Sequence, residues 1–156
     1  MERMLMPTDG SACSEAAIRE GLGYAEALGA EVTFLYVLEY PTTAIYATSD
    51  MPVYAPQLYE DLKTVAQEAL DRAKGLADEA QVSARTMLAE RQPPIDAIHE
   101  AEETHDLVVM GTHGRRGFNR FMFGSVAEGA LRRAEKPYLM IRHVNDTDAK
   151  ESSEIV

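Results

Sequence analysis

Five short apolar runs separated by helical patterns constrain the fold of this chain more than any other feature of its sequence. The runs are the length of strands, and the intervening stretches repeat apolar residues with a helical period. Parallel strands need crossover connections, so this alternation predicts one α/β domain with a five-stranded parallel sheet and helices on both faces. We expect strands at residues 3–7, 32–38, 82–88, 107–110 and 138–141, and helices at 17–28, 57–79, 93–103 and 125–133.

The apolar spacing also predicts which helix faces pack on the sheet. The first helix is expected to bury Ala17, Gly21, Tyr24 and Leu28 and to end at Gly29, because glycine is a common C-terminal cap. Residues 39–56 contain three prolines and are expected to form a long loop. The second helix is expected to bury one broad face: Leu58, Leu62, Val65, Ala69, Leu70, Ala73 and Leu76.

Charge and apolar content exclude several classes of function. With 26 acidic and 15 basic residues the chain has a net charge of −11, which disfavours binding to nucleic acid or to an anionic membrane. No apolar run approaches the roughly 20 residues that span a bilayer, and the N-terminus does not resemble a signal peptide. A lone cysteine, Cys13, suits a reducing cytoplasm. We expect a cytoplasmic domain over residues 1–143 and a polar tail over 144–156.

A glycine-rich segment between the fourth strand and the fourth helix has the features of an anion site. Gly111, Gly114 and Gly117 allow positive φ angles and close approach of backbone N–H groups to a ligand. The segment ends at a helix N-terminus, which favours negative charge. The segment also contains three arginines, Arg115, Arg116 and Arg120, although the chain as a whole is acidic. Together these features favour a phosphate site.

Structural explanations compete with this interpretation. Each glycine taken singly could serve a turn, and residues 125–128 match a capping box in which Ser125 and Glu128 satisfy backbone donors at the helix start. The arginines could reach phosphates or could be solvated charges. The segment is not a P-loop, because it lacks the GK[ST] ending, and no GxGxxG fingerprint follows the first strand.

The spacing of Gly111, Gly114, Gly124 and Ser125 resembles that of the ATP-binding branch of the universal stress protein family: glycine, two residues, glycine, nine residues, then glycine with serine or threonine. The resemblance extends over nearly the whole chain, including residues 7–11 and 137–142. It implies a doubly wound domain with strand order 3-2-1-4-5, and it implies that ATP is bound. Any Mg²⁺ or Mn²⁺ is expected to be held through the phosphates.

The resemblance also implies residue roles. Backbone of the glycine segment would hold the phosphates and ribose, the end of the first strand would line the adenosine, and the second strand would face the adenine. The residues expected to bind nucleotide are Pro7, Thr8, Asp9, Val37, Met110, Gly111, Thr112, His113, Gly114, Arg115, Arg116, Gly117, Gly124, Ser125 and Val126.

No catalytic group is assigned, since no Ser/His/Asp arrangement or set of metal ligands is evident in the sequence. The family likeness implies a nucleotide-dependent regulatory or stress-response protein with at most slow ATP hydrolysis. It also implies a homodimer that pairs its last strand, between Pro137 and Arg142; a monomer whose own tail covers that edge is the alternative. An ATP-using enzyme on the same architecture and a flavodoxin-like module remain the other hypotheses for function.

Overall fold

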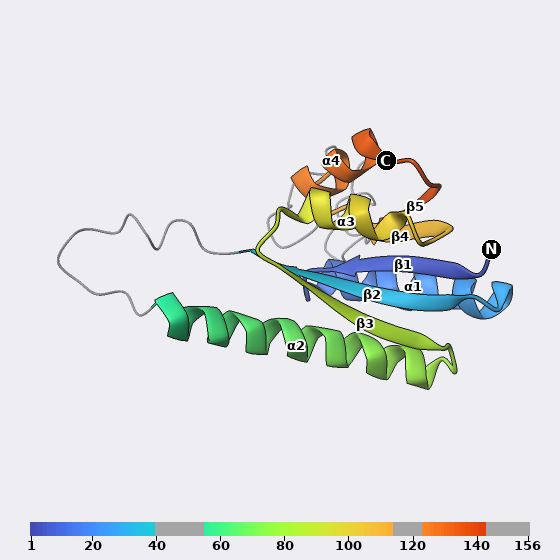
Figure 1. Ribbon diagram of the computed structural model, residues 1–156. Helices are drawn as coiled ribbons and strands as arrows, with labels where there is room; N and C mark the ends of the chain where they lie inside the picture. The colour runs from blue at the N-terminus through green and yellow to red at the C-terminus, as the bar shows by residue number, and fades with distance from the viewer. Residues whose placement is uncertain (40–54, 114–122, 143–156) are drawn as a thin grey trace, which may run out of the picture.

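The computed structural model describes residues 1–39, 55–113 and 123–142, and in them five parallel strands alternate with four helices (Figure 1). The strand order is β3-β2-β1-β4-β5, which confirms the predicted α/β fold and its order 3-2-1-4-5. The expected tail over residues 144–156 lies outside the described part of the chain. The elements are β1 (Arg3–Thr8), α1 (Ala12–Leu28), β2 (Glu31–Leu38), α2 (Ala55–Glu79), β3 (Ala84–Glu90), α3 (Pro94–Glu102), β4 (Leu107–Gly111), α4 (Ser125–Arg133) and β5 (Tyr138–Ile141).

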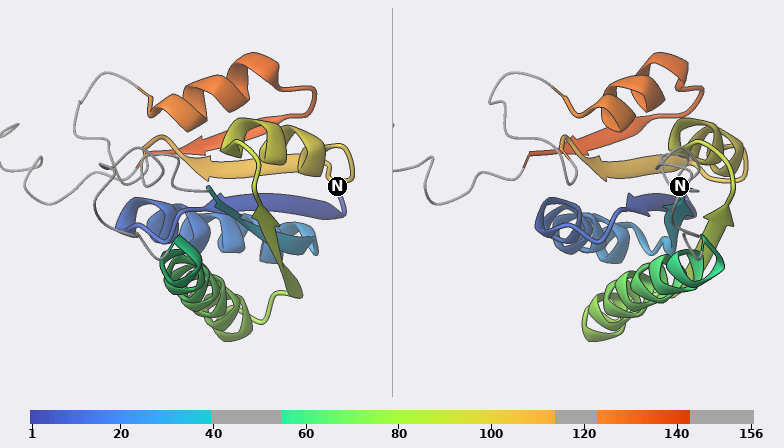
Figure 2. Two further views of the ribbon diagram at one scale, coloured as in Figure 1. Left: turned by 60° about the vertical axis from the view of Figure 1, so that its left-hand side comes forward. Right: turned by 90° about the vertical axis from the view of Figure 1, so that its left-hand side faces the viewer.

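The helices cover both faces of the sheet, α1 and α2 on one and α3 and α4 on the other (Figure 2). Side chains that alternate along each strand supply the two cores. In β2, for example, Phe34 packs in the core under α1 and α2, while its neighbour Leu35 packs in the core under α3 and α4. The inner strands are therefore buried on both faces, which explains why their sequences are continuous apolar runs.

The first helix ends where predicted, but it begins at Ala12, five residues before the expected start, and buries a different face. Ser11 caps its start by accepting a hydrogen bond from the Ser14 N–H, and Gly29 ends it in the left-handed region with φ 63°. Tyr24 and Leu28 were expected to be buried, but they are 45% and 52% exposed. The helix instead presents Ile18, Leu22 and Ala25 to the sheet, together with Ala17 and Gly21. Helical periodicity predicted that one apolar face of the helix is buried, but the position of the sheet determines which residues lie at the centre of that face.

The second helix begins two residues before the predicted start, inside the segment expected to be a loop. Its second residue is Pro56, which a first helical turn tolerates. Two residues of the predicted buried face, Leu58 and Val65, are 37% and 46% exposed. The predicted Ala69, Leu70 and Ala73 are buried in the core beneath the helix, and Ala66, which was not predicted, is buried with them.

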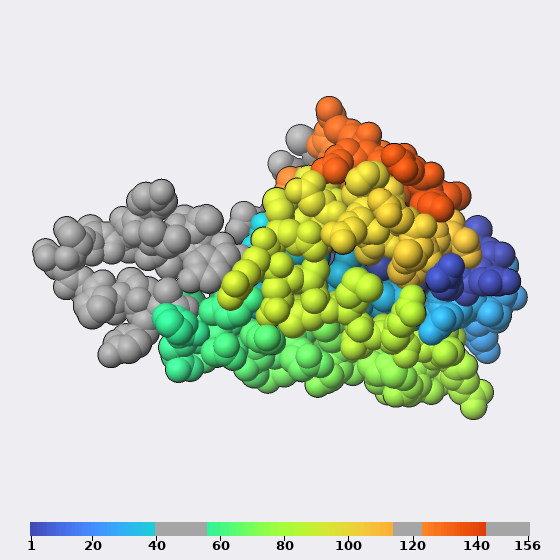
Figure 3. Space-filling view, in the orientation of Figure 1, coloured from blue at the N-terminus to red at the C-terminus, as the bar shows by residue number. Residues whose placement is uncertain are grey.

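The third strand begins and ends two residues later than predicted. Val82 belongs to the turn that ends α2, because its N–H donates to the Ala77 carbonyl at 2.9 Å and Gln81 before it has φ 56°. This strand is an edge of the sheet, and Figure 3 shows β3 and α3 on the surface between α2 and α4. In the described part of the chain, no helix is long and apolar enough to cross a membrane.

Candidate functional site

The carboxyl ends of β1 and β4 lie side by side at the middle of the sheet. After β1 the chain crosses to β2 through α1 on one face, and after β4 it crosses to β5 through α4 on the other (Figures 1 and 2). The two connections diverge, and in open α/β sheets ligands bind beyond the strand ends at such a point, a region referred to below as the crevice. The sequence-predicted site residues at the ends of β1 and β4 therefore meet at this switch point.

The turn between β1 and α1 is held by its own polar side chains. Thr8 is 7% exposed, and its Oγ1 accepts the Gly10 N–H at 3.1 Å and shares a 3.0 Å hydrogen bond with the Ser14 hydroxyl. Asp9 is half-buried, and its Oδ1 accepts the Ser11 N–H at 3.0 Å. Gly10 has φ 73°, a conformation that glycine adopts without strain. Thr8 thus fixes the turn, and the backbone of this turn forms the β1 side of the crevice.

Gly111 forms the β4 side, but not for the expected reason. Gly10 and Gly29 are the glycines with positive φ in the described ranges, so Gly111 is not one of them. A Cβ on Gly111 would instead lie 3.4 Å from the carbonyl oxygen of Cys13 and 3.3 Å from that of His113. The first turn of α1 lies close to the end of β4, which leaves little room for a Cβ at this position.

Thr112 connects three elements beyond Gly111. Its N–H donates to the Ile141 carbonyl of β5 at 2.9 Å, and its carbonyl accepts the Gly124 N–H at 2.8 Å. Its Oγ1 lies 3.0 Å from Nδ1 of His113. The Thr112–Gly124 hydrogen bond brings the start of α4 to the end of β4, so both described flanks of the glycine-rich segment meet. Between them, Gly114, Arg115, Arg116 and Gly117, with Arg120, lie outside the described residues.

The start of α4 differs from the predicted capping box. Gly124 is the N-cap, and Ser125 is the first helical residue. Ser125 therefore lies one position past the N-cap, where its side chain would have to be to cap the helix. Glu128, the other expected member of the box, pairs with Arg132 at 2.7 Å. Ser125 and Val126 thus occupy the first turn of α4, whose N-terminus favours an anion.

The remaining predicted residues lie near the edge of the site or behind it. Pro7 and Val37 are half-buried near the ends of β1 and β2, and Val37 packs on the core under α3 and α4. Met110 is 7% exposed and its side chain belongs to that same core. Any contact of Met110 with a ligand would therefore have to involve its backbone.

Sequence reasoning missed Arg72, which reaches the site from α2. Its Nε lies 2.8 Å from Glu15 Oε1, and its Nη2 lies 3.5 Å from the Gly10 carbonyl oxygen. No local pattern could have identified it, because 57 residues separate Arg72 from Glu15. Gly10 was detectable, since an Asp-Gly pair directly after a strand is a turn signal.

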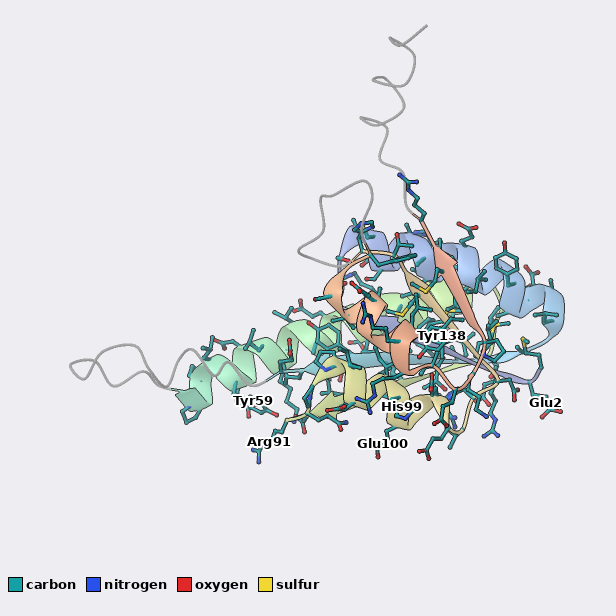
Figure 4. The ribbon with its side chains drawn as sticks, turned by 90° about the horizontal axis from the view of Figure 1, so that it is seen from above. Glu2, Tyr59, Arg91, His99, Glu100 and Tyr138 are labelled. Carbon is teal, nitrogen blue, oxygen red and sulfur yellow. The ribbon has the colours of Figure 1, made fainter. Side chains whose placement is uncertain are left out.

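Histidines elsewhere serve the fold. His105 is buried, with Nδ1 2.7 Å from the Ala101 carbonyl oxygen and Nε2 2.8 Å from the Thr33 hydroxyl. His99 instead contacts buried Glu102, which also accepts the Tyr138 hydroxyl; Figure 4 labels His99 and Tyr138. Within the described ranges, no three His, Cys, Asp or Glu side chains gather to hold a metal ion.

Known proteins share this architecture and, in part, this sequence. A universal stress protein of Methanocaldococcus jannaschii is 34% identical over 143 residues, covering 90% of this chain and 82% of the relative. The solved structure of universal stress protein UspA from Lactobacillus plantarum is 23% identical, with a TM-score of 0.75 over 90% of this chain and 97% of that one.

Two further structures of similar fold contain adenine nucleotides. A universal stress protein in complex with cAMP is 21% identical, with a TM-score of 0.64 over 90% of this chain and 96% of that one. One from Archaeoglobus fulgidus in complex with dAMP is 22% identical, with a TM-score of 0.62 over 90% of this chain and 97% of that one. The sequence model of the universal stress protein family matches residues 1–142. This chain therefore belongs to the universal stress protein family.

Proposed function

We propose that this protein binds an adenine nucleotide, ATP in particular, at the crevice between β1 and β4. The observation that carries the proposal is the Thr112–Gly124 hydrogen bond of 2.8 Å, which holds the N-terminus of α4 beside the strand ends. The Asp9–Gly10 turn lies across the switch point from it. Unpaired N–H groups at a helix start bind phosphate, and the crevice beside them accommodates a nucleoside.

The choice of an adenine nucleotide rests on two kinds of support. Structures of similar fold carry cAMP and dAMP, and the spacing of Gly111, Gly114, Gly124 and Ser125 resembles the family's ATP-binding branch. Mg²⁺ or Mn²⁺ would be held through the phosphates. Nucleotide occupancy would regulate the protein's partners in the cytoplasm, with at most slow hydrolysis of ATP.

The first test is chemical analysis of the small molecules released when the purified protein is denatured, followed by calorimetric titration of the emptied protein with ATP, ADP, AMP and cAMP in Mg²⁺. We expect about one adenine nucleotide per chain and tightest binding of ATP. Gly114→Val should abolish binding and leave the circular dichroism spectrum unchanged, because a side chain there would block the approach of phosphate. Native affinity in a folded Gly114→Val protein would refute the glycine-segment assignment.

We further propose that two copies pair through β5, between Pro137 and Arg142. Within the described residues β5 pairs with β4 alone, and Tyr138, Leu139 and Met140 are half-buried on this edge. The carbonyls of Pro137 and Ile141 accept hydrogen bonds from Val108 of β4 and from Thr112 directly after it. Because bonding direction alternates along a strand, the backbone groups of Met140 face away from β4, where a partner strand could pair with them.

Met140→Pro tests the dimer, because it removes an N–H group from the outer edge of β5. Light scattering after size-exclusion chromatography should report a dimer for the wild type and a monomer for the variant. Thr86→Pro is the matched control, since Ser83 O bonds to β2 and the same alternation turns the backbone of Thr86 outward on the opposite edge. A wild-type monomer, or a dimer lost equally in both variants, would contradict pairing through β5.

A further inference from the structure

Arg72 on α2 links two features that border the candidate nucleotide site. Its Nε contacts Glu15 Oε1 at 2.8 Å, and its Nη2 approaches the Gly10 carbonyl at 3.5 Å. Both helices lie on the same face of the sheet, so this contact crosses from α2 to the beginning of α1 (Figure 2). In the sequence, Arg72 is separated from Glu15 by 57 positions and from Gly10 by 62.

The first target of Arg72, Gly10, is the residue on which the turn depends. Gly10 has φ 73°, and its N–H donates to Thr8 Oγ1 at 3.1 Å. Arg72 approaches the carbonyl oxygen of Gly10, so both the N–H and the C=O of this residue have a side-chain partner. The next N–H, that of Ser11, is fixed by Asp9. The guanidinium thus supports the backbone of the turn that forms the β1 side of the crevice.

The second target, Glu15, carries charge that works against anion binding. Glu15 lies in the first turn of α1, directly after the turn, in a chain whose net charge is −11. A carboxylate at this place would repel the phosphates of a nucleotide, and the interaction between such charges reaches across about 8–10 Å at moderate ionic strength. The guanidinium of Arg72, 2.8 Å from that carboxylate, offsets its charge.

We infer that Arg72 is a positioning residue for nucleotide binding, which holds the Gly10 turn and cancels the charge of Glu15. This inference rests on the proposed nucleotide-binding function and adds to it a residue from an element that contributes nothing else to the described site. Its effect is indirect, since its contacts are with Gly10 and Glu15.

A second ion pair on the same helix provides a matched control. Lys63 lies 2.9 Å from Glu90, and the two side chains are 44% and 36% exposed, comparable with 50% and 28% for Arg72 and Glu15. Lys63 contacts the end of β3, however, and not the turn after β1. Loss of either pair should change the melting temperature by a similar amount, whereas only loss of Arg72 should change nucleotide affinity.

The experiment compares calorimetric titration of ATP with Mg²⁺ into wild type, Arg72→Gln, Lys63→Gln and the double variant Glu15→Gln/Arg72→Gln. Arg72→Gln should weaken binding about two- to fivefold, the range that exposed ion pairs reach, while Lys63→Gln keeps wild-type affinity. The double variant should recover most of the loss, because the repelling carboxylate is gone. The difference between Arg72→Gln and wild type should also shrink as salt rises toward 1 M.

Equal affinity of Arg72→Gln and Lys63→Gln would overturn the inference while leaving the proposed function intact. A double variant as weak as Arg72→Gln would likewise overturn it, since charge cancellation predicts recovery. A wild-type protein that binds none of the nucleotides would instead overturn the proposed function, and the inference with it.

Discussion

The two ends of the sheet use polar side chains in opposite ways. At the amino end, Glu102 and His105 are each 1% exposed and bond to groups of the fold itself. At the carboxyl end, Asp9 and Ser11 are half-buried and hold backbone turns that face solvent. A buried network of satisfied partners stabilises a fold, whereas half-exposed turns at a switch point leave backbone groups for a ligand. Sequence composition does not distinguish these roles, because both ends contain acids, histidines and hydroxyls.

Asp106 adds to the structural character of the amino end. Its Oδ2 accepts the N–H groups of Glu2 at 2.7 Å and Arg3 at 3.0 Å, which ties the start of β1 to the start of β4. These two hydrogen bonds lower the pKa of Asp106. Burial and the hydrogen bond to Glu102 raise the pKa of Tyr138, so its hydroxyl stays protonated as the donor. From this difference between the two ends of the sheet, we expect substitutions at the amino end to lower the free energy of unfolding without changing nucleotide affinity.

The largest expected effect is the loss of stability in Glu102→Ala. One Glu102 oxygen accepts the Glu135 N–H at 3.0 Å and contacts His99 at 2.9 Å, and the other accepts the Tyr138 hydroxyl at 2.5 Å. Removing the buried carboxylate leaves a cavity and deprives the Glu135 N–H, the Tyr138 hydroxyl and His99 of their partner, at a cost of about 3 kcal/mol. Urea unfolding would measure the change.

The control for Glu102 is Glu100→Ala on the same helix, where the side chain is exposed and its loss should change stability by less than about 0.5 kcal/mol. Figure 4 labels Glu100 at the surface. If both variants unfolded at the same urea concentration, the buried network would not stabilise the fold as described.

Gly111→Ala should have the next largest effect, and on ligand binding more than on stability. Its Cβ would lie 3.3 Å from the His113 carbonyl oxygen and 3.4 Å from that of Cys13, so we expect the backbone at the β4 side of the site to shift slightly. We expect nucleotide affinity to fall about tenfold, with a loss of stability of about 1 kcal/mol. Calorimetric titration and urea unfolding would separate the two.

Gly23→Ala is the matched control in α1, because a Cβ there meets nothing within 4 Å. Alanine in a helix interior is favoured over glycine by about 0.5–1 kcal/mol, so this variant should be more stable and should bind nucleotide normally. If Gly23→Ala also weakened nucleotide binding, a substitution in α1 far from β4 would disturb the site as well. The weaker binding of Gly111→Ala could then not be attributed to the close contact at Gly111.

The smallest expected effect is a pH dependence of stability at the amino end. Burial lowers the pKa of His105 below its ordinary value of 6.5. Its Nδ1–H donates to the Ala101 carbonyl while Nε2 accepts the Thr33 hydroxyl, the pattern of a neutral ring, and Arg85 in turn donates to Thr33 at 2.9 Å. A histidine with a lowered pKa in the folded state contributes stability above pH 6.5, which is lost as the pH falls and the unfolded chain takes up the proton.

Urea unfolding from pH 7.5 to 5.5 tests this prediction when wild type is compared with His105→Gln. The variant should be less stable at pH 7.5, and the difference between the two proteins should narrow as the pH falls, because only wild type loses the histidine contribution. A difference that stays constant across this range would show that His105 is not held neutral by the fold.

The sequence by itself determined the strand and helix order, the stop at Gly29 and the location of the glycine-rich segment, because each depends on neighbouring residues and on periodicity. Local patterns also gave approximate element boundaries. They failed by one or two residues at Val82 and Ser125 and by five at the start of α1, since hydrogen bonds formed at helix ends decide those positions.

Tertiary structure alone decided which side chains meet. The pairing of Arg72 with Glu15, of Tyr138 with Glu102 and of His105 with Thr33 spans 57, 36 and 72 residues. It also turned Tyr24 and Leu28 of α1 toward solvent, and it made Gly111 a point of close packing between α1 and β4. Such contacts arise from the order in which strands assemble and from the placement of helices over them, and no local property of the sequence encodes either.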